Sequence, residues 1–303
     1  MKIIVTHTSP DMDAITSVWI IKRFLLGWED AVVKYVPAGE TINGKTPNEA
    51  IEKIRSESSG QVGEDEVMHV DTGMGPLDHH QIFDTNICGA SRSWDFVKST
   101  LEEQGHDLRK EKIEAIDRII KVVVDIDHFK EVFWKDASAD HYEFHLVGIL
   151  DGLKMLKQNQ DDYYTNFIME ALDALLNEFE NRIWAEKEIK ENGKIFETRF
   201  GKGIGFETIN DTVIKLSQKM GYVAVVRKDP RKGYVRIKVL PSKVGDEDID
   251  LTLAYEQLKK MDPDATWFLH VSKKMLLNGT PKNPKMIPTK LPLTDIIKVI
   301  EKI

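Results

Sequence analysis

The sequence predicts an α/β protein in which an N-terminal, mostly parallel sheet is flanked by helices and a second, smaller α/β domain follows. Three observations support this class. Short β-branched segments alternate with longer segments of helical periodicity in the first half of the chain. Two of those short segments, 2–6 and 67–71, run directly into polar residues, as strands that end at a ligand site do. The composition then changes beyond residue 192.

The first half begins as strand, loop and helix. Residues 2–6 form the predicted strand, 7–13 the polar loop, and apolar residues from Ile15 to Leu26 fall on a helical stripe. Further strands are expected at 32–36 and 67–71. Further helices are expected at 47–56, with proline in its first turn, and at 92–104, 111–124, 141–156 and 161–191.

The second half is expected to be a separate domain. Residues 196–206 are β-like and rich in glycine, and 222–227 and 234–240 are strands joined by a turn at 229–233. A strand at 266–271 and helices at 251–260 and 294–303 complete it. The predicted domains are 1–157, which carries the site, 158–192, a connector helix, and 193–303.

The composition bounds the class of protein. The chain has 303 residues, 41% of them hydrophobic and 30% charged, which suits a folded core. Its formal net charge of -8 gives no general attraction to nucleic acid, so contacts with phosphate need local basic groups or bound cations. Cys88, the one cysteine, fits a reducing compartment, and no apolar run reaches membrane-spanning length. We expect a cytoplasmic protein with no membrane association.

The strongest local signal is the pattern H-x-x-x-D-x-D, formed by His7, Asp11 and Asp13. An imidazole and two carboxylates from one loop at a strand end suit Mn²⁺ or Mg²⁺. The alternative is purely structural: Asp13 begins the helix and Asp11 is a turn residue.

Two further groups follow the strand at 67–71. Asp71 closes that strand and is placed to bridge two cations, while His69 is interpreted as a core or supporting histidine. Asp78, His79 and His80 are adjacent, so one imidazole can bind metal, the other can reach a phosphate oxygen, and Asp78 can orient a ring. The alternative for these residues is an exposed polar loop.

A fourth acidic group follows the apolar run 122–124. Asp125 and Asp127 both lie there, and Asp127 is preferred as the ligand. A carboxylate near the core needs a partner, either a metal or a basic side chain such as Arg118 or Lys130.

These four motifs, in this order, resemble those of the DHH phosphoesterase superfamily, which includes RecJ-type exonucleases, family II inorganic pyrophosphatases and cyclic dinucleotide phosphodiesterases. The resemblance covers about the first 130 residues. The Asp-His-His-Gln run at 78–81 and its short distance from Asp71 resemble the MYG exonuclease branch, whereas the first motif resembles the pyrophosphatase and RecJ form. The subfamily stays open.

The resemblance implies a site with two divalent cations, Mn²⁺ or Mg²⁺, that share Asp71 and activate water for attack on phosphorus. It implies His7 and Asp11 at one ion and Asp13, His79 and Asp127 at the other. His80 would stabilise charge on the phosphoryl oxygens. The implied substrate is a nucleotide or short nucleic acid.

The C-terminal domain is where proteins of this superfamily usually hold the substrate. Its glycine-containing segments, 201–205 and 278–280, match the superfamily's glycine-rich segment only weakly. Arg227 and Arg231, in a basic hairpin tip, and Arg92, near a helix start, are candidate phosphate-binding residues.

Three matters stay open at this stage. A pyrophosphatase needs a closed pocket rich in lysine and arginine, and the basic residues of the C-terminal domain look sparse for that. A non-catalytic nucleotide-binding module would keep the fold without turnover. A homodimer is neither indicated nor excluded.

Overall fold

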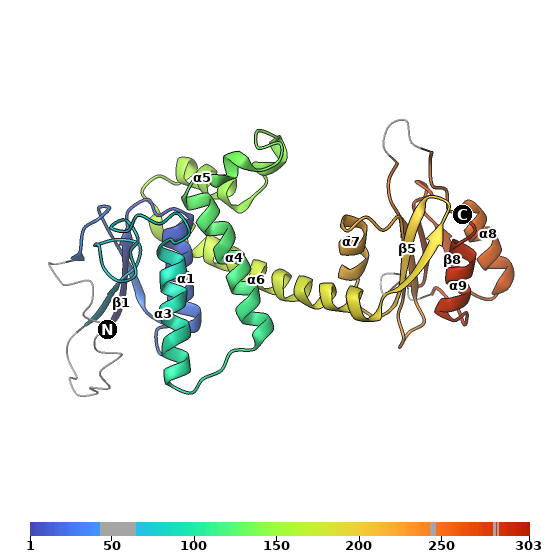
Figure 1. Cartoon of the computed structure of the whole chain (residues 1–303), viewed down its shortest axis with the longest axis horizontal. Coiled ribbons are helices and arrows are strands. Elements are labelled where there is room, and N and C mark those ends of the chain that lie inside the picture. Colours follow the sequence, from blue (N-terminus) through green and yellow to red (C-terminus); the bar gives the residue numbers. More distant parts are fainter. Residues whose placement is uncertain (43–64, 243–246, 281–282, 284) are drawn as a thin grey trace. The chain divides into compact units, whose positions relative to one another are not determined.

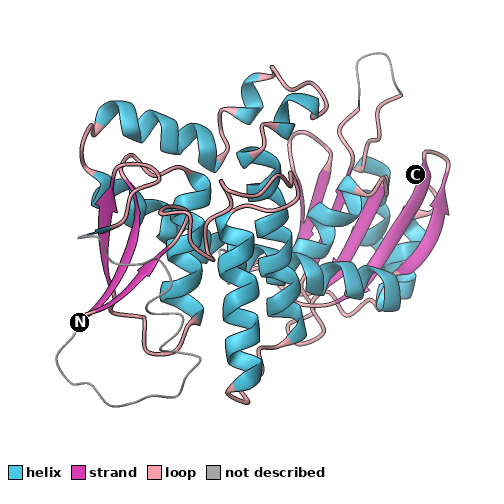
Figure 2. Cartoon of the chain, turned by 60° about the vertical axis from the view of Figure 1, so that its left-hand side comes forward, coloured by secondary structure: helices cyan, strands magenta, loops and turns pink. Residues whose placement is uncertain are grey.

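The structure is a computed structural model, and it describes residues 1–42, 65–242, 247–280, 283 and 285–303. The chain divides into two compact units, unit 1 from Met1 to Glu180 and unit 2 from Asn181 to Ile303. The division falls within the long helix α6, Asp161–Asn192. Each unit contains a β-sheet and helices, which confirms the predicted α/β class (Figure 2).

Unit 1 contains a parallel sheet of three strands in the order β2-β1-β3. The strands are β1 (Lys2–His7), β2 (Val32–Val36) and β3 (Glu66–His69). In the register of the sheet, Ile3 lies opposite Val32 on one side and Val67 on the other. Because the strands are parallel, the chain leaves all three at the same edge, which brings His7 and the residues after His69 together.

The helices of unit 1 lie beside this sheet, and the first of them packs directly on β1 (Figure 1). They are α1 (Met12–Phe24), α3 (Gly89–Glu103), α4 (Lys110–Asp127), α5 (Leu146–Leu156) and the first part of α6, with 3₁₀ turns η2 (Lys130–Phe133) and η3 (Asp140–Tyr142). The helix expected at 47–56 lies outside the described residues.

Helix α1 is central to unit 1. Asp11 caps it by accepting a 3.0 Å hydrogen bond from the backbone N–H of Ala14. Trp19 is fully buried, and its indole N–H donates to Asp173 of α6 over 2.7 Å. Burying an indole N–H without a partner is costly, so this bond holds the first half of α6 against α1.

The described residues of unit 2 form a six-stranded sheet in the order β4-β5-β6-β7-β9-β8, in which the β5–β6 pair is parallel and the other pairs are antiparallel. Its elements are β4 (Lys194–Thr198), β5 (Gly201–Glu207), α7 (Thr212–Lys219), β6 (Ala224–Lys228), β7 (Val235–Val239), α8 (Thr252–Met261), β8 (Trp267–Leu269), β9 (Met275–Asn278) and α9 (Leu293–Ile300).

Alternation along β6 places helices on both faces of this sheet. Ala224 and Val226 belong to the core cluster with α8 and α9, whereas Val225 belongs to the cluster with α7 and the end of α6. Figure 1 shows α7 on one side of the sheet and α8 and α9 on the other. Two short elements of this unit, α7 and β9, are absent from the sequence-based expectation.

The glycines of β5 have packing roles. A Cβ on Gly203 would lie 2.3 Å from the ring of Phe196, and one on Gly205 would lie 2.7 Å from Ile297. The side chain of Asn278, in the other glycine-containing segment, donates to two backbone carbonyls and accepts from Thr289. Both segments therefore stabilise the sheet of unit 2. None of the described helices is long and apolar enough to cross a membrane.

Candidate metal centre

The loop after β1 supplies the first imidazole and carboxylate. His7 Nδ1 lies 3.0 Å from the carbonyl oxygen of Thr8, and a proton on this nitrogen leaves the lone pair of Nε2 free. Nε2 lies 3.7 Å from Oδ2 of Asp11. Asp11 therefore has both of the roles expected from the sequence, in the local fold and at the candidate metal site. Its Oδ1 caps α1, while its Oδ2 faces His7.

Asp71 lies between two histidines that come from different parts of the chain. Its Oδ2 is 3.5 Å from Nε2 of His7, and its Oδ1 is 3.6 Å from Nε2 of His79. The residue is 2% exposed and has φ of +49°, a left-handed conformation that is uncommon outside glycine. Its backbone N–H is held by the carbonyl of Leu77 at 3.0 Å. The loop thus imposes this conformation and directs the two oxygens to different imidazoles.

Asp13 is fixed by the start of a second helix. Its oxygens accept hydrogen bonds of 2.6 and 2.7 Å from the backbone N–H groups of Gly89 and Ala90, in the first turn of α3. Oδ2 also lies 3.6 Å from Nε2 of His79. A Cβ on Gly89 would be 2.8 Å from Cβ of Asp71 and 3.0 Å from Oδ2 of Asp13, so glycine permits this close approach.

The last acid comes from the end of α4. Asp127 Oδ2 lies 3.5 Å from Nε2 of His79 and 3.6 Å from Nε2 of His128. His128 was not singled out in the sequence, although it directly follows Asp127; its Nε2 is also 2.7 Å from the carbonyl of Ile87. Asp125 instead lies 3.8 Å from Lys130. Of the two aspartates left open, Asp127 is the one that lies at the histidines.

These side chains enclose one small volume, which we call the cage: His7, Asp11, Asp13, Asp71, His79 and Asp127. Within the cage, Asp71 Oδ1, His79 Nε2 and Asp127 Oδ2 are buried without a hydrogen-bond partner among the described residues. Separations of 3.5–3.7 Å are too long for hydrogen bonds. They are close to the spacing of about 3 to 3.6 Å expected of neighbouring ligands at about 2.1 Å from one ion. The residues fit divalent metal.

The electrostatics of the cage also favour cations. Burial raises the pKa values of Asp13 and Asp71, and repulsion by neighbouring aspartates raises them further. Burial raises the pKa of Asp127 and lowers that of His79. Within the described ranges, the ion-pair partners of the four cage carboxylates are histidines. A bound divalent cation would remove this repulsion.

Asp78 and His80 lie beside the cage. Asp78 is buried and accepts from the backbone N–H of Met74 at 2.8 Å and from that of His80 at 3.1 Å. Its Oδ1 also lies 2.7 Å from Nδ1 of His80. Burial by itself would raise the pKa of Asp78, but these hydrogen bonds outweigh it and lower the pKa. The half-exposed ring of His80 is therefore held through Nδ1, which leaves Nε2 free.

Of the three candidate arginines, Arg227 lies away from the position that the sequence suggested, and Arg92, in the first turn of α3, has its side chain bound to a backbone carbonyl. Arg227 is in β6 rather than at a hairpin tip, and its buried guanidinium pairs with Asp211 at 2.8 Å. The Nε of Arg92 donates to the carbonyl of Pro76 at 2.6 Å. The N–H groups at the start of α3 bind the carboxylate of Asp13. Only Arg231 is exposed in a turn, where its backbone N–H donates to Asp229.

His69 has a structural role, in keeping with the core interpretation. It is 1% exposed, and its Nε2 accepts from the backbone N–H of Ile42 at 3.1 Å. Burial lowers its pKa, so the neutral ring is favoured.

Comparison with known proteins adds little to this geometry. No protein family and no curated protein matches the sequence. Among solved structures, a pGpG-specific phosphodiesterase, PggH from Vibrio cholerae, is similar over 99% of this chain and 98% of that chain, with 13% sequence identity and a TM-score of 0.26. At that identity and TM-score, the similarity does not decide the family or the activity of this chain.

Proposed function

We propose that this chain is a divalent-metal-dependent phosphoesterase that hydrolyses a phosphodiester of a nucleotide or oligonucleotide, as an exonuclease or a small-nucleotide phosphodiesterase. One observation carries the proposal: the two oxygens of buried Asp71 face two different imidazoles at 3.5 and 3.6 Å. A carboxylate placed in this way can bridge two cations. The resemblance of the four motifs to the DHH phosphoesterase superfamily supports the same activity.

The distances suggest how the ligands divide between two ions. His7 and Asp11 lie on the Oδ2 side of Asp71 and would hold one ion. Asp13 and Asp127 both approach Nε2 of His79 on the Oδ1 side and would hold the other with it. Imidazole and carboxylate together suit Mn²⁺, with Mg²⁺ as the alternative.

Two bound cations would supply a deprotonated water near neutral pH and would offset the charge of the substrate phosphate. The surrounding side chains have separate tasks. Asp78 accepts the Nδ1 proton of His80 and so fixes the orientation of that ring. When the His80 ring carries a proton on each nitrogen, its Nε2–H would donate to the phosphoryl oxygens and stabilise charge that develops during attack. Gly89 and Ala90 keep Asp13 in place.

In this function, residues 1–157 would carry out the chemistry and residues 158–192 would connect the two domains. Residues 193–303 would bind the substrate. Arg231, in the exposed turn after β6, is the residue of that part proposed to contact phosphate.

Metal stoichiometry tests the bridging arrangement directly. The full chain, loaded with Mn²⁺ and desalted, is expected to retain two ions, measured by atomic emission. His7→Ala and His79→Ala should each retain one ion, and Asp71→Ala should retain none. Asp125→Asn is the matched control, because this acid lies in the last turn of the same helix as Asp127 but pairs with Lys130. Two ions in Asp71→Ala would overturn the bridge.

A substrate panel tests the activity on the same samples. p-Nitrophenyl phosphodiesters, short oligonucleotides, cyclic dinucleotides and pyrophosphate are each assayed with Mn²⁺. Hydrolysis of diesters that requires Asp71 supports the proposal. Hydrolysis of pyrophosphate alone would identify a pyrophosphatase. Metal-dependent nucleotide binding without hydrolysis would identify a non-catalytic module.

A further inference from the structure

A pocket of about 590 Å³ lies in unit 1, and two of its lining residues are neighbours in the chain of cage residues. Met12, which is between Asp11 and Asp13 in the chain, forms part of its wall, as does Ile126, the neighbour of Asp127. The volume is in the range of small-molecule sites. No part of the proposed chemistry uses this pocket, so its own lining must indicate what it binds.

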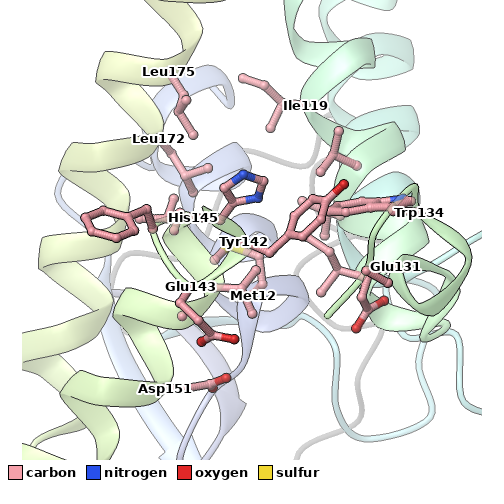
Figure 3. Close-up of a pocket in the computed structure, with 18 of the residues that line it drawn as sticks. Met12, Ile119, Glu131, Trp134, Tyr142, Glu143, His145, Asp151, Leu172 and Leu175 are labelled. Carbon is pink, nitrogen blue, oxygen red and sulfur yellow. The ribbon is translucent and has the colours of Figure 1, made fainter. Parts of the chain in front are cut away.

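One wall of the pocket is aliphatic. Ile119, Val123 and Ile126 lie at helical spacing on α4, and Leu172 and Leu175 of α6 face them across the pocket (Figure 3). None of the described residues that line the pocket is lysine or arginine. The pocket therefore does not suit a phosphate group, and it suits an uncharged, largely apolar part of a ligand.

A second wall is aromatic. The rings of Trp134 and Tyr142 have centroids 5.6 Å apart, and Tyr142 and His145 lie 5.2 Å apart in an edge-to-face arrangement. The hydroxyl of Tyr142 donates to the carbonyl of Lys135 at 2.7 Å, which holds its ring in place. All three rings are drawn at the pocket in Figure 3. Fixed ring faces favour a flat ligand that can stack.

One buried polar atom of the pocket lining has no hydrogen-bond partner in the part of the chain that the structure describes. Oε2 of Glu131 is buried and makes no hydrogen bond among the described residues, although the residue lines the pocket. The other acids of the lining, Glu143 and Asp151, are exposed to solvent. A buried acceptor without a partner is costly, and a ligand N–H group would satisfy it.

We propose that this pocket holds the nucleobase next to the scissile phosphate, with the ring stacked on the aromatic wall and its N–H edge on the carboxylate of Glu131. The inference rests on the proposed function, because it takes the cage to hold the phosphate. A flat heterocycle with N–H donors satisfies the aliphatic wall, the rings and the carboxylate together. An aliphatic amine would satisfy only the carboxylate.

The number of donors sets the expected order of bases. A carboxylate can accept two parallel N–H bonds, and guanine is the common base that presents a ring N–H and an amino group side by side. Inosine keeps the ring N–H and lacks the amino group, so it is the matched ligand that removes one bond. Adenosine offers one amino group and no ring N–H at that edge.

Uncharged nucleosides allow the pocket to be tested apart from the cage. Guanosine, inosine and adenosine are titrated calorimetrically into the full chain in EDTA, since they carry no phosphate and need no metal. Guanosine should bind saturably and about tenfold more tightly than inosine. Glu131→Gln should lower guanosine affinity about tenfold and abolish the preference over inosine. Glu178→Gln, an exposed acid of α6 outside the pocket, is the matched control.

The outcomes separate this inference from the proposed function. Failure of all three nucleosides to bind, or equal affinities in the wild type and in Glu131→Gln, overturns the nucleobase pocket, and the guanosine–inosine comparison needs no variant to fold. Saturable binding of spermidine that competes with guanosine, with no base preference, overturns it in favour of an amine site. Nucleoside binding as expected, together with failure of the chain to retain Mn²⁺ after loading and desalting, would keep the pocket and remove the phosphoesterase proposal.

Discussion

Buried aspartates occur in both units, but their surroundings are opposite. In unit 1, burial and mutual repulsion raise the pKa values of Asp13 and Asp71. In unit 2, burial would raise the pKa of Asp229, but the backbone N–H groups of Lys232 and Arg231 outweigh it and lower the pKa. Nearby, Asp211 pairs with the guanidinium of Arg227 at 2.8 Å.

The acids of unit 2 stabilise the fold, whereas the surroundings of the cage acids in unit 1 suit a bound ligand. The acids of unit 2 find their donors and cations within the chain, so their charge stabilises the local structure. Asp71 and Asp127 of the cage face imidazoles at non-bonding distances, and each has one buried oxygen without a hydrogen-bond partner among the described residues. A chain that keeps such an arrangement has a use for it beyond stability, and metal binding is the use that this donor set fits.

Among the variants that test this difference between the two units, the largest effect is expected from a substitution of Gly89. Gly89→Ala places a Cβ 2.8 Å from Asp71 Cβ and 3.0 Å from Asp13 Oδ2, so the cage must shift. We expect Mn²⁺ affinity and diester hydrolysis to fall about a hundredfold, the upper end of the range for support of metal ligands. Gly152→Ala, in helix α5 with nothing within 4 Å of the added Cβ, is the control and should retain both. Unchanged Mn²⁺ affinity in Gly89→Ala would contradict the packing of the cage.

The matching test in unit 2 is Asp211→Ala. Among the described residues, it leaves the buried guanidinium of Arg227 with the carbonyl of Thr208 as its hydrogen-bond partner. We expect the free energy of unfolding to fall by about 2 kcal/mol, measured by urea denaturation. Because the acid is structural, Mn²⁺ content should stay at the wild-type value. A loss of bound metal without a loss of stability would reverse the roles assigned to the two regions.

The half of the site that follows the parallel strands could be predicted from sequence. His7 ends β1 and Asp71 follows β3, and these are neighbouring strands, so sheet topology alone brings the two together. The loop from Asp11 to Asp13 continues from the same strand end. The existence of the long helices and of most strands was also predictable, because their hydrophobic periods are regular.

The rest depends on contacts that local pattern does not encode. The N–H groups of Gly89 and Ala90 reach Asp13 across more than seventy positions, and backbone donors leave no signature in sequence. Arg227 is in a basic run that reads as solvated, yet its partner Asp211 places it inside the sheet of unit 2. Short elements such as α7 and β9 lack the length that makes periodicity informative.

Asp78 lies beside the cage in unit 1, but, like Asp229 of unit 2, it has hydrogen bonds that lower its pKa. These bonds also hold His80 at 2.7 Å. Asp78→Asn should therefore reduce kcat for diester hydrolysis about tenfold while two Mn²⁺ ions stay bound. His80→Ala and the double variant should show about the same loss as each other, since Asp78 acts through His80. Additive losses in kcat would mean that Asp78 has a separate task.

The smallest expected effect is a gain in stability on replacing Asp71 by asparagine. Asp71→Asn removes a buried charge, gives its amide N–H groups an imidazole to donate to, and places asparagine at a left-handed φ that it tolerates well. The pKa of Asp71 is raised in the folded chain, so its ionised form destabilises the metal-free fold. This destabilisation is complete at a pH above the folded pKa. It is absent at a pH below the unfolded pKa of about 3.9. In EDTA at pH 8, the free energy of unfolding of the variant should be about 1 kcal/mol higher than that of the wild type. This gain in stability should disappear as the pH falls toward about 4. With saturating Mn²⁺ the order should reverse, since only the wild type is stabilised by bound metal. A variant that is less stable than the wild type in EDTA at pH 8 would show that Asp71 belongs with the structural acids of unit 2.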